Sequence, residues 1–166
     1  MQGVHASSSF AEVKMAHKVL VVDDEPSVVT IITYALGRKG YHVIQAFDGE
    51  QALDAVVAEK PDLVVLDLMM PNVDGWRVYE RLKTDPKHKG IKVVVLTGVG
   101  EFESQLKSLQ FGVDEYLTKP FSATEVAQVV EDVLNEERGE RREKERARKE
   151  AKLRTIVSIM KRSQEK

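Results

Sequence analysis

Three aspartates stand where apolar runs of the sequence end. Asp23 and Asp24 directly follow the run "KVLVV", and Asp67 follows the run "DLVVL". Three carboxylates brought together repel one another, and they stay ionised at neutral pH only where a cation compensates them. The cysteine and histidine ligands that zinc prefers do not accompany them, whereas a hard divalent ion takes carboxylate oxygens. We therefore expect a Mg²⁺ site, in which Mn²⁺ can take the same place.

Two further polar residues follow segments that are predicted to be strands. Thr97 comes directly after "KVVVL", and Lys119 comes directly after "DEYLT". A purely structural ion does not need a hydroxyl and an ammonium group, but these are the donors that the oxygens of a phosphoryl group require. The carboxylate of Asp67 can attack phosphorus and form an acyl phosphate. These residue types indicate Mg²⁺-assisted phosphoryl transfer onto an aspartate.

The elements that must position these residues alternate along the chain. Short runs rich in Val and Leu predict strands, and segments with apolar residues three and four apart predict helices. This alternation predicts an α/β fold, a doubly wound five-stranded parallel sheet with helices on both faces. Ligands of such sheets bind outside the carboxyl ends of the strands, so the five polar residues should meet at one edge. The predicted strands are 18–22, 41–45, 62–66, 92–96 and 114–118, and the predicted helices are 26–38, 49–58, 74–84 and 101–110.

Each of these residues also has an ordinary structural interpretation. The pair Asp23 and Asp24 stands just before a proline and could cap a helix, and Asp67 alone could be an acid of a surface loop. Thr97 could simply end a strand, and Lys119 could be a solvated charge. Their joint position at four strand ends of one sheet edge favours a functional site.

Four motifs in this order resemble the receiver domain of two-component response regulators, which has a flavodoxin-like (βα)5 fold. They are "VLVVDDEP", "PDLVVLDLMMPNVDGW", "VVVLTG" and "GVDEYLTKPF", and the resemblance covers about residues 18–134. It implies that Asp67 is the phosphoacceptor and that Asp23 and Asp24 form the acidic pair, with Asp24 the more direct Mg²⁺ ligand. It also implies that the backbone carbonyl of Met69 is a further metal ligand.

The resemblance also implies a conformational switch. Thr97 corresponds to the switch hydroxyl, Lys119 to the lysine of the site, and Tyr116 to the switch aromatic residue. The bond between Lys119 and Pro120 is expected to be cis. The chain departs from the family at Gly98, where the family usually has Ala and where the glycine leaves more room beside the phosphoryl site.

The family resemblance implies that the chain is a signalling module and not an enzyme with a separate substrate. Its only chemistry would be self-catalysed phosphotransfer and autodephosphorylation. The phosphoryl donor is expected to be a sensor histidine kinase or a phosphotransfer protein. Met69 and Val99 are placed by resemblance at the mouth through which a hydrolytic water enters, and neither binds water strongly. We therefore expect a long-lived phosphorylated state.

Other classes of protein fit the motifs less well. An aspartate-based phosphatase of the haloacid dehalogenase type needs an acid two residues after its nucleophile, where this chain has Met69. A nucleotide-binding module needs a glycine-rich loop after its first strand, and "DDEPSVV" would repel phosphates. A degenerate receiver that only dimerises is disfavoured because the acid, hydroxyl and lysine positions are all filled.

Charge divides the chain into parts. Residues 135–166 contain 12 basic and 7 acidic residues, against 13 basic and 20 acidic residues in the rest. We predict a disordered N-terminal extension or tag over residues 1–16, a receiver domain over residues 17–134, and a charged helical tail over residues 135–166. The tail is too short for an independent output domain. A stand-alone receiver is therefore our first interpretation, and a receiver fragment of a longer protein, with an output domain after the tail helix, is the alternative.

The tail is predicted to be a helix surrounded by solvent. Acidic residues precede basic ones by four positions, as in Glu145 and Lys149 or Glu150 and Arg154, which favours a helix, whereas Gly139 weakens it. An apolar stripe over residues 153–160 could pair two chains or meet a partner helix, but it is too short to predict a coiled coil. We expect no nucleic acid partner. The chain contains no cysteine, which fits a reducing, cytoplasmic setting. The lack of a signal-peptide pattern and of an apolar run of about 20 residues predicts a soluble protein with no membrane span.

Overall fold

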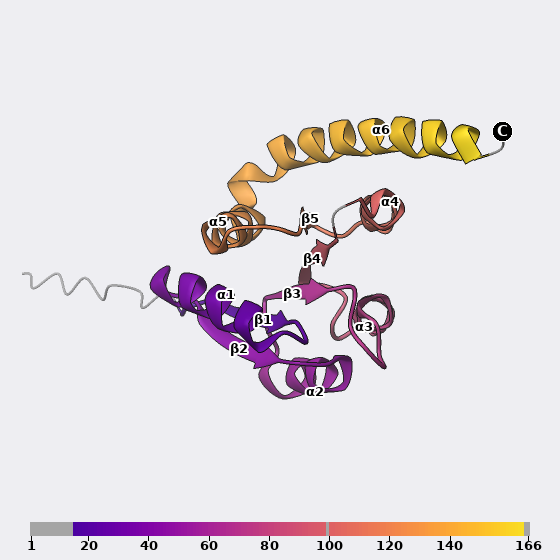
Figure 1. Ribbon diagram of the computed structural model, residues 1–166. Helices are drawn as coiled ribbons and strands as arrows, with labels where there is room; N and C mark the ends of the chain where they lie inside the picture. The colour runs from indigo at the N-terminus through magenta and orange to yellow at the C-terminus, as the bar shows by residue number, and fades with distance from the viewer. Residues whose placement is uncertain (1–14, 99, 165–166) are drawn as a thin grey trace, which may run out of the picture.

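The computed structural model describes residues 15–98 and 100–164 (Figure 1). Most of the extension predicted over residues 1–16 therefore lies outside the described residues. Strands and helices alternate from β1 to α5, and a short 3-10 turn then leads into a long final helix. The elements are β1 Lys18–Val22, α1 Pro26–Arg38, β2 His42–Ala46, α2 Gly49–Glu59, β3 Leu63–Asp67, α3 Gly75–Thr84, β4 Lys92–Thr97, α4 Phe102–Gln110, β5 Glu115–Thr118, α5 Ala123–Leu134, η1 Glu136–Arg138 and α6 Gly139–Gln164.

The five strands form one parallel sheet in the order β2-β1-β3-β4-β5. The predicted fold class is therefore confirmed. β2 and β3 begin and end one residue later than predicted, so Asp67 is the last residue of β3 rather than the residue after it. In this register Val22 lies beside Leu66, and Asp67 lies beside Leu96 of β4. The ends of β1 and β3 thus reach the same edge of the sheet.

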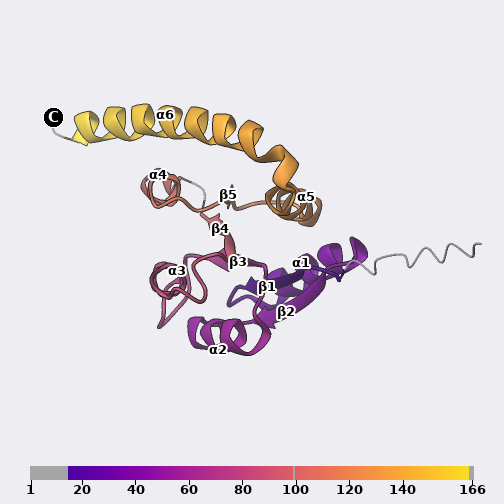
Figure 2. The same ribbon diagram turned by 180° about the vertical axis from the view of Figure 1, so that it is seen from behind.

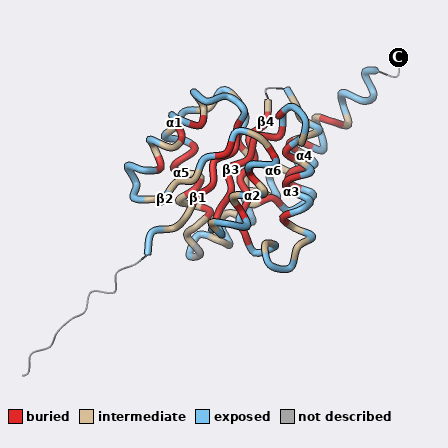
Figure 3. The backbone as a smooth tube through the Cα atoms, turned by 90° about the horizontal axis from the view of Figure 1, so that it is seen from below, coloured by how far each residue is buried: buried red, intermediate tan, exposed pale blue. Residues whose placement is uncertain are grey.

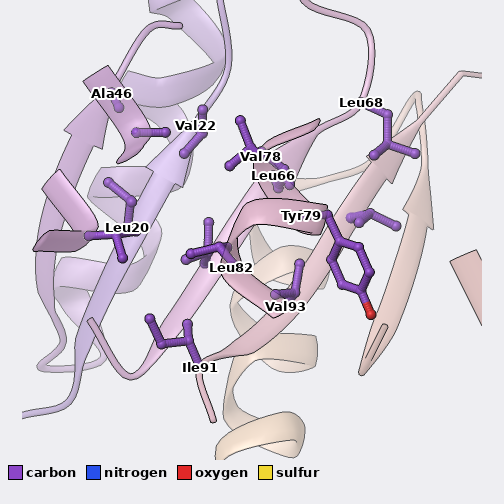
Figure 4. Packing of buried hydrophobic residues seen from close by; sticks show 14 of the residues in the cluster. Leu20, Val22, Ala46, Leu66, Leu68, Val78, Tyr79, Leu82, Ile91 and Val93 are labelled. Carbon is purple, nitrogen blue, oxygen red and sulfur yellow. The ribbon is translucent and has the colours of Figure 1, made fainter. Parts of the chain in front are cut away.

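Two apolar layers enclose the sheet, and its inner strands β1, β3 and β4 are largely buried, as Figure 3 shows in red, whereas the edge strands β2 and β5 are mostly intermediate or exposed. On one side Leu20, Val22 and Leu66 pack with side chains of α2 and of α3, including Val78 and Leu82 (Figure 4). On the other side the sheet packs against α1 and α5. A strand buried on both faces cannot shift its register without exposing apolar side chains, so this packing fixes the ends of β1, β3 and β4.

The final helix, α6, is confirmed as a helix, and most of its residues are exposed as expected, but solvent does not surround it on every side. Leu153 and Val157 are buried, and α6 packs against α4. Gly139 is its first residue, so the glycine does not weaken the helix interior. Within α6, Arg154 pairs with Glu150 as predicted, whereas Lys149 pairs with Glu115 of β5 instead of Glu145. One face of the tail therefore packs against the receiver.

Among the described residues, no helix is both long enough and apolar enough to cross a bilayer.

Candidate functional site

Three carboxylates meet at the carboxyl end of β1 and β3. Oxygen atoms of Asp23, Asp24 and Asp67 all lie within 4.8 Å of one another. Asp23 and Asp67 are almost fully buried, with exposed fractions of 0% and 2%, whereas Asp24 is exposed. The structure therefore brings together the three acids that the sequence pattern placed at this edge.

The position of Asp23 is fixed by two donors. Its Oδ1 accepts a hydrogen bond from the backbone N–H of Glu25 at 3.0 Å, and its Oδ2 accepts one from Nζ of Lys119 at 3.2 Å. The residue that caps α1 is Glu25, and no side chain makes the capping hydrogen bond. The alternative in which the aspartate pair caps a helix is therefore wrong, because the carboxylate of Asp23 turns toward Lys119.

Asp67 is held at the end of β3 by the loop that follows it. Its Oδ1 accepts a hydrogen bond from the backbone N–H of Met69 at 3.1 Å, and its Oδ2 lies 3.5 Å from Nζ of Lys119. The loop then folds back, and the N–H of Gly75 donates to the carbonyl of Leu68 at 3.2 Å. A Cβ atom at Gly75 would lie 2.3 Å from the carbonyl oxygen of Asp67, so only glycine allows this close approach.

The electrostatics of the cluster favour a bound cation. Burial, and then the charge of Asp23, raise the pKa of Asp67 to about 6, although the N–H of Met69 and the ammonium of Lys119 oppose the shift. Burial alone would lower the pKa of Lys119, but Asp67 and Asp23 outweigh it and the pKa is raised. At neutral pH one ammonium group thus faces three carboxylates. An all-oxygen donor set with this excess of negative charge fits a divalent ion such as Mg²⁺.

The two residues expected to act as a switch lie at different depths. Thr97 is fully buried, and its hydroxyl donates to the carbonyl of Leu117 on β5 at 3.4 Å, away from the carboxylates. Tyr116 is half-buried on β5, and Nζ of Lys149 lies 5.0 Å from the centre of its ring. The bond between Lys119 and Pro120 is cis, as the resemblance implied.

Glu101 is a residue at this edge that the sequence analysis missed. Its Oε2 accepts a hydrogen bond from the N–H of Gly98 at 3.1 Å. A Cβ atom at Gly98 would lie 2.8 Å from Oε1 of Glu101, so the space that the glycine leaves is filled by this carboxylate. A single glutamate three residues after a glycine gives no signal in the sequence, because the contact depends on the conformation of the loop after β4.

Comparison with known proteins decides the family. Residues 19–131 match the response regulator receiver domain. The chain belongs to this family. The match covers β1 from its second residue, the other four strands and the acidic cluster. It identifies the chain as a receiver domain with an acidic site rather than a classical enzyme.

Relatives of known function are regulators. The chain is 45% identical over 120 residues to the alkaline phosphatase synthesis transcriptional regulatory protein PhoP of Bacillus subtilis, which covers 72% of this chain and 49% of that protein. It is 38% identical over 116 residues to the phosphate regulon transcriptional regulatory protein PhoB of Pseudomonas aeruginosa, covering 70% of this chain and 51% of that protein. The chain thus spans about half the length of these curated relatives.

Solved structures resemble the same part of the chain. The receiver domain of NtrX from Brucella abortus aligns with a TM-score of 0.65 at 30% identity, over 70% of this chain and 97% of that one. The chemotaxis response regulator CheY4 of Vibrio cholerae aligns with a TM-score of 0.67 at 27% identity, over 72% of this chain and 100% of that one. Both comparisons cover nearly the whole of the other chain, so the long α6 is an addition to a complete receiver fold.

Proposed function

We propose that Asp67 accepts a phosphoryl group from a sensor histidine kinase or a phosphotransfer protein, and that the receiver then changes conformation to signal to a partner. One observation carries this proposal: the buried carboxylate of Asp67 lies within 4.8 Å of those of Asp23 and Asp24 and faces the ammonium of Lys119. Family membership supports the same reaction.

Asp67, Lys119 and Thr97 have different roles in the proposed reaction. A carboxylate oxygen of Asp67 attacks phosphorus, the bond from phosphorus to the donor breaks, and the donor leaves with the electron pair of that bond. The ammonium of Lys119 then stabilises the negative charge on the phosphoryl oxygens. The hydroxyl of Thr97 would have to leave the carbonyl of Leu117 before it could donate to the same group.

A divalent ion completes the site. The carboxylates of Asp23, Asp24 and Asp67 and the backbone carbonyl of Met69 would hold Mg²⁺, with Asp24 the most accessible of the acids. When bound, the ion supplies charge neutralisation that the single ammonium of Lys119 cannot provide against three carboxylates. Mn²⁺ has similar oxygen ligands and can serve in its place.

The signal would travel from Thr97 to the surface formed by α4, β5 and α5. Inward movement of Thr97 vacates space that Tyr116 can occupy, and Tyr116 is already in contact with Lys149 of α6. The change at β5 would thus reach the tail. Hydrogen exchange of residues 101–140 with and without a phosphoryl mimic tests this relay, and identical protection in both states would contradict it.

The partners and setting are proposed from the same features. The receiver is proposed to be cytoplasmic and to take its phosphoryl group from a kinase. It is not expected to bind nucleic acid itself. Residues 153–160 are proposed to pair two chains or to bind a partner helix. Such a contact would use the exposed Ile159 and Met160, or it would require α6 to leave α4. Since the chain spans about half of its curated relatives, a receiver fragment with an output domain after α6 remains the alternative to a stand-alone receiver.

Treatment with acetyl phosphate tests the reaction. The intact mass of the chain should increase by one phosphoryl group when Mg²⁺ is present, and it should stay unchanged in excess chelator. Asp67→Asn should abolish the increase, whereas Asp54→Asn, which changes an exposed carboxylate of α2, should not. Labelling of Asp67→Asn at the level of the unmodified chain, or labelling in chelator, would contradict the proposal.

A further inference from the structure

Helix α6 crosses the edge of the sheet and lies over α5, β5 and α4 in both opposite views (Figures 1 and 2). Its two buried apolar residues, Leu153 and Val157, lie in the half of the helix that runs along α4. Val157 and Met160 also line a pocket of about 280 Å³ with residues 100–104 at the start of α4. The helix therefore rests on a surface that includes the loop leading from β4.

The first half of α6 contacts this surface through arginines. The guanidinium of Arg142 donates to the carbonyl of Val133 at 3.3 Å and to that of Asp114 at 3.2 Å. Arg146 donates to the carbonyl of Leu109 at 3.3 Å. Val133 and Leu109 belong to the last turns of α5 and α4, where the helix dipole attracts cations. The carbonyl of Leu109 also accepts from the N–H of Gly112, so Arg146 shares this acceptor. These contacts favour positively charged side chains at the positions of Arg142 and Arg146.

Lysines extend the same pattern. Nζ of Lys149 lies 2.7 Å from Oε1 of Glu115 and above the ring of Tyr116, and Nζ of Lys161 lies 3.7 Å from Glu103. The side chain of Glu115 is only 12% exposed, so this ion pair is partly shielded from solvent. The surface thus binds basic side chains of α6 through carboxylates and through carbonyl groups at the ends of α4 and α5.

We propose that this surface, here called the α4–β5 face, is a docking site for a basic amphipathic helix, and that α6 occupies it in cis. The face consists of Glu103, Leu109, Asp114, Glu115, Tyr116 and Val133. The helix that it fits carries cations at positions i, i+4 and i+7 and apolar residues at i+11 and i+15, which in α6 are Arg142, Arg146, Lys149, Leu153 and Val157. While α6 is docked, a partner helix with this pattern is excluded.

The occupancy of the face is expected to be reversible. α6 has 26 residues but only two buried apolar side chains, and most of its other residues are exposed. Elements with few buried apolar contacts open locally at a small cost compared with global unfolding. The helix can therefore leave the face while the sheet and its two layers stay folded.

A labelled synthetic peptide of residues 139–164 tests the proposal by fluorescence anisotropy against the full chain. In the double variant Leu153→Asp and Val157→Asp the chain's own helix should leave the face, and the peptide should bind at least tenfold more tightly than to the unmodified chain. The matched control, Thr155→Asp and Ile159→Asp, adds the same charges at exposed positions of α6 and should bind the peptide as weakly as the unmodified chain. Equal binding to all three chains, or no binding to the double variant, would overturn the proposal.

A second pair of variants, each with one surface substitution, keeps the proposal testable if the double variant does not fold. Lys149→Glu leaves the apolar contacts intact and should raise peptide affinity several-fold, whereas Lys152→Glu on the exposed side should not. At the concentration of the peptide assay, sedimentation should give a monomer for the unmodified chain. A dimer whose α6 helices dock on the opposite chain would show that the face is occupied in trans and would overturn the proposal.

Discussion

Replacing Asp67 with Asn should make the metal-free protein more stable at neutral pH. The folded structure raises the pKa of this carboxyl group from 3.8 to about 6, chiefly by burial and by the charge of Asp23. A shift of this size corresponds to a penalty of at most about 3 kcal/mol for keeping the group ionised in the folded state. Asn removes the charge and keeps the shape, but it also loses part of the attraction of Lys119, so the gain should be about 1 to 3 kcal/mol.

The sign of the pH dependence follows from the raised pKa. Below about pH 3.8 the carboxyl group of Asp67 is protonated in both states, and the penalty is absent. Stability of the unmodified chain is then lost as the pH rises toward about 6, above which the full penalty applies. The difference between variant and unmodified chain should therefore be close to zero at low pH and largest at neutral pH.

Urea unfolding across this pH range, in the presence of chelator, measures the difference directly. Asp54→Asn removes an exposed carboxylate of α2 and should show no such trend. Millimolar Mg²⁺ should stabilise the unmodified chain more than Asp67→Asn and so narrow the gap, because an ion compensates the carboxylate that the variant lacks. A gap that does not change with pH, or a variant that is less stable at neutral pH, would refute the reasoning.

Three further substitutions test other parts of the structure. Gly75→Ala should lower the free energy of unfolding by about 1 to 3 kcal/mol in urea titrations, because its Cβ would clash with the carbonyl of Asp67, whereas Gly90→Ala, with open space around it, should not. Leu153→Ala should speed amide exchange in α6 about tenfold or more and leave the sheet unchanged, since it removes one of two buried apolar anchors. Met69→Asn should shorten the lifetime of the phosphorylated state several-fold, because an amide can position the hydrolytic water; equal or slower decay would contradict this.

The site could be predicted because its residues stand at strand ends. In a parallel sheet the order of the strands decides which ends are neighbours, and the apolar runs before Asp23 and Asp67 were sufficient to place both at one edge. Only family resemblance pointed to Tyr116, whose position on a half-buried strand is ordinary. Val99, which the lifetime prediction also used, lies outside the described residues.

The docking of α6 could not be predicted from its sequence. Its charges favour a helix in any environment, and the acidic residues that precede Lys149 and Arg154 gave both lysine and arginine a partner within the helix. The structure instead pairs Lys149 with Glu115, which is 34 residues away in the sequence. A contact between distant segments depends on how the body folds, and the apolar stripe over residues 153–160 did not indicate which surface it would meet.

Reduction of the phosphorylated protein with borohydride tests the central claim most directly. The reagent converts an aspartyl phosphate to homoserine, which peptide mass spectrometry locates in the chain. After treatment with acetyl phosphate and Mg²⁺, we expect homoserine at position 67 alone, and none in excess chelator. Homoserine at Asp23 or Asp24, or an equal amount at Asp67 without a divalent ion, would contradict the assignment of Asp67 as the metal-dependent phosphoacceptor.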